Sequence, residues 1–228
     1  GGGTDGVTNS FASGIWYLDS LGLYAATGTS VFARQDLVGA FYGLLEDGCP
    51  FGGLDPRAPQ CDFVAPRPNP DFWSALLWKK TMGQRVLKVS VSSAATDGAA
   101  GPWLRAYAHC APAGALFPAG AVSLLLINTH DTKPATVDVA GLSSGSSSRL
   151  LWELRAKGGE PTSNATLLGG RELQVAPDGA AGWRLPPLEG RSLAAAEAIT
   201  VAPASYSFFS YLRAGAAACS GGGSGGSK

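Results

Sequence analysis

The 228 residues are enough for one large domain or two small ones with a substantial core. The formal net charge is zero and only 15% of residues are charged, so the chain lacks the basic surface needed to bind nucleic acid or an anionic membrane. Its longest apolar runs, such as residues 122–127, are too short to span a bilayer. Four cysteines without a C-x-x-C pair and only two histidines argue against a zinc site and favour disulfides.

Three glycines open the chain: Gly1, Gly2 and Gly3. Bare backbone N–H groups just before a helix let an anion approach closely, so this triplet is a candidate anion site. A frayed terminus is the alternative interpretation. No initiator methionine and no charged-then-apolar leader is visible, so we expect this sequence to be part of a longer chain.

Apolar residues at helical spacing predict a first helix over residues 10–23. Residues 8–10 (Thr, Asn, Ser) are its candidate caps, and Gly22 is a natural stop. The short apolar run at residues 30–33 predicts a buried strand.

A long loop is expected over residues 36–68, and loops of this length in a compact domain are usually functional or disordered. After it, Asn69 is the predicted cap of a second helix, Pro70 its first residue and Gly83 its end. The order helix, strand, loop, helix is typical of the last part of a (β/α)8 barrel, where the loops beyond the strands carry the site.

After Gly83 the apolar pattern changes to alternation in short segments separated by Gly, Pro, Ser or Asp-Gly, the signature of an antiparallel sandwich. The predicted strands cover residues 86–91, 103–109, 122–127, 135–139, 149–154, 172–175, 199–202 and 205–212. We therefore predict a mixed fold: the C-terminal end of a (β/α)8 barrel over residues 1–84, an antiparallel β-sandwich over residues 85–219, and a disordered Gly/Ser tail over residues 220–228.

Cys110 ends one predicted strand and Cys219 follows the last one, so a bond between them would close most of the sandwich. Chain-entropy arguments give such a loop about 4–5 kcal/mol of stabilisation. We predict this pair and a second one between Cys49 and Cys61, which would pin the long loop. Asn164 opens an Asn-Ala-Thr glycosylation acceptor sequence. Together these features indicate a secreted or luminal protein, whether extracellular, vacuolar or lysosomal, or membrane-associated.

Several runs resemble the heparanase family, glycoside hydrolase family 79, in order and spacing from Gly1 nearly to Cys219. They cover residues 11–22, 34–35, 39–44, 69–80, 105–110, 124–128, 185–188, 205–209 and 217–219. The sequence YGLL followed by NPDFWSALLWKK is most similar to the plant-like branch, and the segment from Cys49 to Cys61 is longer than the family pattern.

The resemblance implies a (β/α)8 barrel joined to a β-sandwich, and hydrolysis of glucuronides with retention of configuration. Retaining glycosidases use two nearby carboxyl groups, one as nucleophile and one as acid/base. By the resemblance both lie upstream of Gly1, so no catalytic residue is assigned to this chain. The implied partner is a glucuronide-containing oligo- or polysaccharide or glycoconjugate, and no cofactor or metal is implied.

Four residues are candidates for binding the sugar. By the resemblance, the backbone N–H groups of Gly1 and Gly2 hold the sugar carboxylate, Tyr42 adds a hydroxyl and Gln35 lines the same pocket. Glycine lets a carboxylate approach the main chain, and tyrosine places a donor on a rigid ring. The alternatives are that Tyr42 only packs against the barrel and that Gln35 is a structural amide.

Other reactive groups fit this scheme less well. Asp36 is the one carboxylate of the first third placed at a predicted strand end, but it stands alone. Asp71 falls in a first helical turn, where a negative charge favours the helix dipole. His109 and His130 have no nucleophile motif near them, which argues against a Ser-His-Asp site.

Two functions therefore remain. The first is an enzyme, a heparanase-like β-glucuronidase of which this chain is the C-terminal part, inactive by itself. The second is a non-catalytic carbohydrate-binding or structural β-sandwich protein. An open barrel remnant would expose apolar helix and strand faces, which favours the second function for the chain alone.

Overall fold

The computed structural model describes residues 3–46, 67–92, 103–142, 149–179, 182–194 and 197–220. The helices are α1 (Phe11–Ala26), α2 (Pro70–Thr81), the short α3 (Ala217–Ser220) and a 3-10 turn at Lys157–Gly159. The strands are β1 (Leu45–Glu46), β2 (Arg67–Pro68), β3 (Val86–Leu87), β4 (Leu104–Cys110), β5 (Val122–Asn128), β6 (Ala135–Val137), β7 (Arg149–Ala156), β8 (Thr166–Leu168), β9 (Arg171–Glu172), β10 (Ala176–Asp178), β11 (Gly182–Arg184), β12 (Arg191–Leu193), β13 (Ile199–Val201) and β14 (Ser205–Tyr211).

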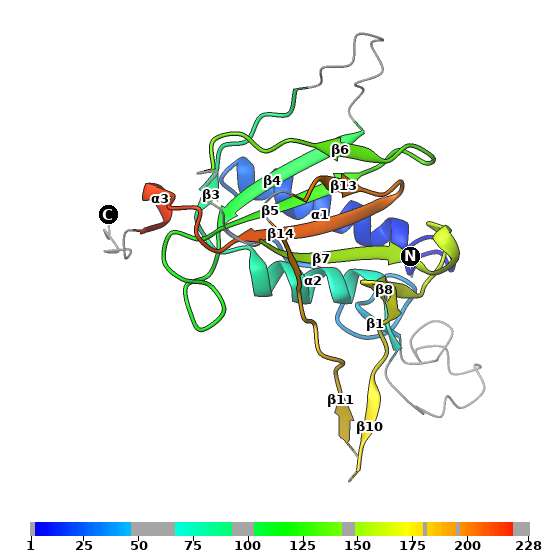
Figure 1. Ribbon diagram of the computed structural model, residues 1–228. Helices are drawn as coiled ribbons and strands as arrows, with labels where there is room; N and C mark the ends of the chain where they lie inside the picture. Colours follow the sequence, from blue (N-terminus) through cyan, green and yellow to red (C-terminus); the bar gives the residue numbers. More distant parts are fainter. Residues whose placement is uncertain are drawn as a thin grey trace, which may run out of the picture.

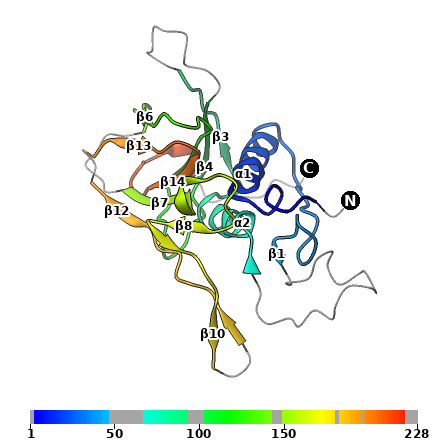
Figure 2. The ribbon, with the colours of Figure 1, turned by 90° about the vertical axis from the view of Figure 1, so that its right-hand side faces the viewer.

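The centre of the fold is an eight-stranded sheet in the order β3-β4-β5-β14-β7-β8-β9, with β12 also paired to β7. Its strand pairs are antiparallel. Helices α1 and α2 cover one face of this sheet, and the small sheet β13-β6 lies on the other, as the two views in Figures 1 and 2 show. The β10-β11 hairpin projects away from these layers (Figure 1).

The fold has two hydrophobic cores, one on each face of the central sheet. Strands β5 and β14 contribute side chains to both, because they are buried on both faces. On β14, Tyr206 and Phe208 belong to the core beneath the helices, whereas Phe209 belongs to the core beneath β13 and β6. This alternation follows from the two-residue period of a strand. The strand predicted over residues 205–212 is therefore present as β14, with a core on each of its faces. The core under the helices also contains Phe11 and Trp73, from the predicted barrel part.

Helix α1 runs past Gly22, its predicted stop, and ends at Ala26. Gly22 is buried instead against the ring of Tyr107 on β4, and a Cβ atom there would overlap that ring. The glycine therefore permits close packing of helix on sheet rather than ending the helix. Helix α2 begins at Pro70 as predicted, with Asn69 at the N-cap position.

The caps of the two helices differ from the prediction. Neither Ser10 nor Asn69 makes a side-chain capping hydrogen bond. Instead, the backbone N–H groups of Phe11 and Ala12 donate to the carbonyls of Ser163 (2.8 Å) and Pro161 (2.9 Å). A loop just before β8, more than 140 residues away in sequence, thus satisfies donors that every helix leaves unpaired at its start.

The predicted strand at residues 30–33 is wrong: this segment has no strand pairing, and Val31 is 79% exposed. A barrel strand needs a neighbour on each side to hydrogen-bond with, and the described residues supply none here. The other predicted strands appear with shifted ends, as β3 to β7, β9, β13 and β14. The short strands β8, β10, β11 and β12 were not predicted, and neither were β1 and β2, which lie within the expected loop over residues 36–68.

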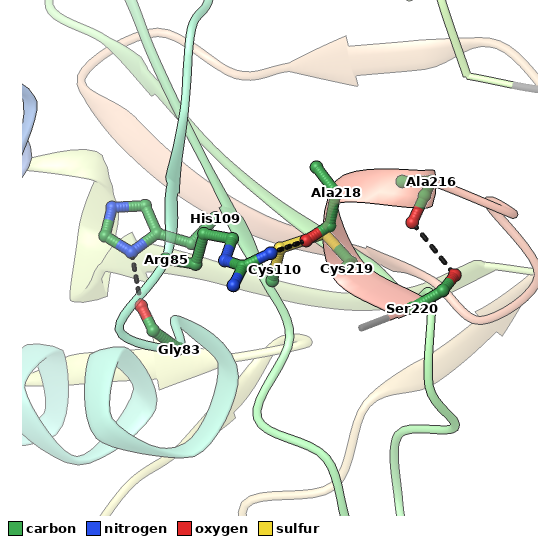
Figure 3. Close-up of a disulfide and its surroundings, with 8 residues drawn as sticks. All are labelled: Gly83, Arg85, His109, Cys110, Ala216, Ala218, Cys219 and Ser220. Atoms are coloured by element: carbon green, nitrogen blue, oxygen red, sulfur yellow. Dashed lines mark hydrogen bonds between the residues drawn. A yellow bond between two sulfur atoms is a disulfide. The ribbon is translucent and has the colours of Figure 1, made fainter. Parts of the chain in front are cut away.

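Cys110 and Cys219, the predicted pair, form a disulfide with a sequence separation of 109 residues (Figure 3). Beside it, the Arg85 side chain donates a hydrogen bond to the carbonyl of Ala218 in α3. The Arg85 carbonyl accepts from the N–H of Cys110 at the end of β4, so Arg85 links α3 to this strand end. Cys49, Cys61 and the tail after Ser220 lie outside the described residues.

Removing this disulfide should destabilise the fold strongly. We expect the double substitution Cys110→Ala/Cys219→Ala to lower the free energy of unfolding by about 4–5 kcal/mol, because it frees a loop of this length in the unfolded state. Urea denaturation of the two proteins measures this difference. Ser220→Ala is the matched control, since it removes only the hydroxyl bond from α3 to the carbonyl of Ala216, the residue before this helix. A double variant as stable as this control would contradict the prediction.

His109 on β4 is 3% exposed, and its Nδ1 lies 2.6 Å from the carbonyl of Gly83 (Figure 3). Its Nε2 is buried without a hydrogen-bond partner among the described residues. Its ring and that of Trp78 pack edge to face, with ring centroids 5.2 Å apart. Burial lowers the pKa of His109, and the Gly83 carbonyl only partly opposes this.

Stability should therefore fall on acidification through this histidine. The unfolded chain takes up a proton below about pH 6.5 that the folded chain resists, so each pH unit below that value costs up to about 1.4 kcal/mol. We expect urea midpoints between pH 7.5 and 5 to fall less steeply in His109→Phe, which keeps a ring against Trp78 but cannot titrate. Equal slopes in the two proteins would contradict this assignment.

Candidate functional site

The structure brings the N-terminal glycine segment against the loop that carries Tyr42. A Cβ atom built on Gly3 would lie 3.0 Å from Cδ1 of Tyr42 and 3.1 Å from its backbone nitrogen. Gly3 also has a φ of +80°, a backbone conformation that side chains disfavour. Glycine is thus required here for two reasons, and the contact joins two of the segments predicted to bind the sugar. Figure 2 shows the N-terminal segment beside the chain that leads into β1.

A threonine hydroxyl ties these segments together. Thr8 Oγ1 accepts a hydrogen bond from the backbone N–H of Thr4 (2.9 Å). The same hydroxyl lies within bonding distance of the carbonyls of Thr4 (3.0 Å) and Phe41 (2.8 Å), the residue just before Tyr42. One small side chain therefore contacts the segment after Gly3 and the segment before Tyr42 at once.

A buried asparagine makes a second tie. Asn9 is 2% exposed, and its Nδ2 donates to Asp5 Oδ1 (2.9 Å) and to Glu46 Oε1 (2.7 Å) on β1. Its Oδ1 accepts from the backbone N–H of Gly6 (2.8 Å). Glu46 also faces Arg67 at 3.5 Å, across the β1-β2 pair. All hydrogen-bonding groups of the buried amide are used, as burial of a polar side chain requires.

The loop around Tyr42 is folded back on the segment that follows Gln35. Backbone N–H groups of Leu44 and Leu45 donate to the carbonyls of Asp36 (3.1 Å) and Leu37 (2.9 Å). Gly43 is buried in this turn, where a Cβ atom would lie 3.0 Å from Asp36 Oδ1. That oxygen is buried without a partner among the described residues, so the Asp36 carboxylate faces the turn.

Arg34 anchors this segment to α2. Its Nη2 donates to Asp71 Oδ2 at 2.6 Å; the side chains are 13% and 0% exposed, respectively. Its Nη1 donates to the carbonyl of Gln35 (2.9 Å), and its guanidinium carbon lies 5.7 Å from the ring centroid of Trp16 and 5.6 Å from that of Tyr17. Burial raises the pKa of Asp71, and the adjacent guanidinium opposes that rise. Arg34 therefore fixes the backbone at Gln35 by an ion pair, a hydrogen bond and two ring contacts.

Of the four predicted sugar-binding residues, the structure describes two. Tyr42 is half-buried against Gly3, and its hydroxyl makes no hydrogen bond to another described residue. Gln35 is exposed and lies next to the same loop through the bonds of Asp36. Gly1 and Gly2 lie outside the described residues, and their role stays a prediction. Asn164 is exposed, as a glycosylation site needs to be.

Sequence reasoning missed the roles of Thr8, Asn9 and Glu46. The first two have the residue types and positions of helix caps, and Glu46 has the position of a solvated loop carboxylate. No local pattern predicts that they meet, because their partners are 33 and 37 residues away in sequence.

Within the described part of the chain, no helix is long and apolar enough to cross a bilayer.

Comparison with protein-family models finds no match, but single proteins are similar to the chain. It is 44% identical to heparanase-like protein 1 of Arabidopsis thaliana over 134 residues, which are 59% of this chain and 20% of that protein. It is 31% identical to baicalin-β-D-glucuronidase of Scutellaria baicalensis over 206 residues, which are 90% of this chain and 33% of that protein. The chain thus spans no more than about a third of these relatives.

Among solved structures, the fold is similar to an α-L-arabinofuranosidase from Thermotoga maritima, solved as an arabinose complex. The TM-score is 0.56 at 15% identity, and the match covers 89% of this chain and 38% of that one. At this identity the likeness concerns the fold alone.

Breaking the Arg34–Asp71 pair should destabilise the fold. We expect Asp71→Asn to lower the free energy of unfolding by about 3–5 kcal/mol, because it leaves a buried guanidinium without its counter-charge. Glu153→Gln is the matched control: it breaks the more exposed pair with Arg155, for which a loss below about 1 kcal/mol is expected. Similar urea denaturation curves for both variants would show that the buried pair contributes no more to the free energy of unfolding than the exposed pair does.

Proposed function

We propose that this chain, which belongs to the heparanase-like family of glycoside hydrolases, supplies the glucuronate-binding part of a retaining β-glucuronidase and carries neither catalytic carboxylate. In this proposal residues 1–84 are the end of a (β/α)8 barrel and residues 85–219 a β-sandwich. The observation that supports it most directly is the contact of Gly3 with Tyr42, because it places a glycine main chain next to a tyrosine. Backbone N–H groups and a phenol are suitable donors for a carboxylate.

The substrate in this proposal is a glucuronide-containing saccharide or glycoconjugate. An anionic sugar would bind through neutral donors, with the glycine amides at its carboxylate and the Tyr42 hydroxyl beside it. Gln35, exposed next to the same loop, adds an amide that both donates and accepts hydrogen bonds. A secreted or luminal location agrees with the Cys110–Cys219 disulfide, because disulfides persist in oxidising compartments.

One carboxylate pair in the chain has to be considered as a catalytic alternative. Asp5 and Glu46 accept hydrogen bonds from the same Asn9 nitrogen, so their oxygens are close together. A retaining glycosidase needs carboxyl groups about 5–5.5 Å apart, one of them kept protonated by an apolar environment. Here Asp5 is exposed and also accepts from the Gly6 N–H, while Glu46 faces Arg67. These partners make both carboxyl groups acceptors that hold the loop, and Asp5 is exposed rather than enclosed by apolar side chains, so we assign this pair no catalytic role.

The alternative function is a non-catalytic carbohydrate-binding or structural protein. Large apolar side chains are exposed along α1 and the segment that follows it, with Trp16 and Leu23 each 55% exposed and Val31 79% exposed. An exposed apolar face of this kind is typical of an interaction surface, so for the chain alone it favours this alternative. If this chain bound no glucuronide, that result would favour the structural role.

We expect the chain to bind methyl β-D-glucuronide without hydrolysing an aryl β-D-glucuronide. Isothermal titration measures binding, with methyl β-D-glucoside as the matched ligand because it differs only in carrying a hydroxymethyl group in place of the carboxylate. Tyr42→Phe should weaken glucuronide binding about 3–10-fold by removing one hydrogen bond, and Tyr24→Phe, an exposed tyrosine on α1, should not.

Turnover of the aryl glucuronide by this chain would refute the absence of catalytic carboxylates, and Asp5→Asn and Glu46→Gln would then show whether their pair is responsible. Equal binding of glucuronide and glucoside would refute carboxylate recognition. Binding of neither ligand would favour the purely structural alternative.

A further inference from the structure

The contact between Gly3 and Tyr42 is flanked by two side-chain ties of different chemistry. On one side the Thr8 hydroxyl contacts the Thr4 N–H and the Phe41 carbonyl. On the other side the Asn9 amide contacts Asp5 and Glu46. Thr8 and Asn9 are consecutive, so one short stretch of chain contacts the Tyr42 loop both before Tyr42, at Phe41, and after it, at Glu46.

We propose that Thr8 and Asn9 are positioning residues that set the distance between the glycine main chain and Tyr42, and hence the geometry of glucuronate binding. This inference rests on the proposed function, because it assigns the two residues to that same site. Neither residue needs to touch the sugar. Their role is to hold the main chain at Gly3 and the Tyr42 ring at a fixed separation.

The ties have a rigid base. Asn9 and Ser10 are buried, and Phe11, which follows them, is fully buried and stacks on Tyr206 of the central sheet with ring centroids 5.0 Å apart. The N–H of Phe11 also donates to the Ser163 carbonyl. The side chains of Thr8 and Asn9 therefore extend from a point fixed on the sheet, which is what a positioning group requires.

Each tie also sets a direction that a nonpolar side chain could not. The Thr8 hydroxyl can donate one hydrogen bond, to the carbonyl of Thr4 or of Phe41, while its oxygen accepts from the Thr4 N–H. It therefore joins the two segments only when both lie within hydrogen-bonding distance. The Asn9 amide presents donors to two carboxylates that would otherwise repel each other, and an acceptor to the Gly6 N–H. Losing the amide donors leaves Asp5 and Glu46 facing each other without a bridge.

Substitutions that keep shape and remove one function test this inference. Thr8→Val removes the hydroxyl, and Asn9→Asp keeps the acceptor for Gly6 but loses the donors and adds a third negative charge. Thr8→Ser should restore the wild-type behaviour. Thr27→Val is the matched control, because Thr27 at the end of α1 also donates its hydroxyl to backbone carbonyls, those of Leu23 and Tyr24.

Two measurements separate loop geometry from sugar binding. The first is the NMR cross-relaxation between the Gly3 α-protons and the Tyr42 ring, which needs no ligand. The second is the dissociation constant for methyl β-D-glucuronide. We expect Thr8→Val and Asn9→Asp to lose most of the cross-relaxation and to bind about 5–10-fold more weakly, while Thr8→Ser and Thr27→Val match the wild type.

Unchanged cross-relaxation in Thr8→Val and Asn9→Asp would overturn the inference, whatever the ligand does. Lost cross-relaxation with an unchanged dissociation constant would overturn the positioning role, because the loop geometry would not matter to the sugar. If the wild-type chain bound no glucuronide while the cross-relaxation still responded, the proposed function would fail and the tie between the loops would stand.

Discussion

The start of α1 is the point on which the site depends. A helix begins with N–H groups that its own turns leave unpaired, and in α1 two of them are satisfied by the carbonyls of Ser163 and Pro161. The stacking of Phe11 on Tyr206 fixes the same turn on the central sheet. Because these contacts are backbone bonds and a buried ring pair, the N-terminal segment leaves the sheet in one direction.

That direction determines what the first residues meet. The segment before α1 passes the Tyr42 loop, where Gly3 lies against the ring and Thr8 contacts the Phe41 carbonyl. The Tyr42 loop is held from its other end by Arg34, whose buried pair with Asp71 ties it to α2. Both helices pack on the same core beneath the central sheet. The two halves of the candidate site are therefore positioned by one core, although neither half is part of it.

Local rules predicted the elements whose determinants are local. Pro70 fixes the start of α2, and the two-residue alternation of β14 separates Tyr206 and Phe209 onto different faces. Local rules failed where a distant partner decides. The apolar run at residues 30–33 needs neighbouring strands to become one, and Gly22 is a glycine because of Tyr107, 85 residues away along the chain. A sequence pattern describes the residue and not the surface that it will meet.

The candidate site illustrates this limit and explains it. Thr8 and Asn9 are the residue types that cap helices, and from the sequence that is the natural interpretation. In the folded chain the helix donors are already satisfied by the carbonyls of residues 161 and 163. A threonine and an asparagine that are not needed as caps keep their hydrogen-bonding groups for other partners, and a side chain as buried as Asn9 must find them. The same long-range contact that fixes α1 thus makes Thr8 and Asn9 available to join the glycine segment to the Tyr42 loop.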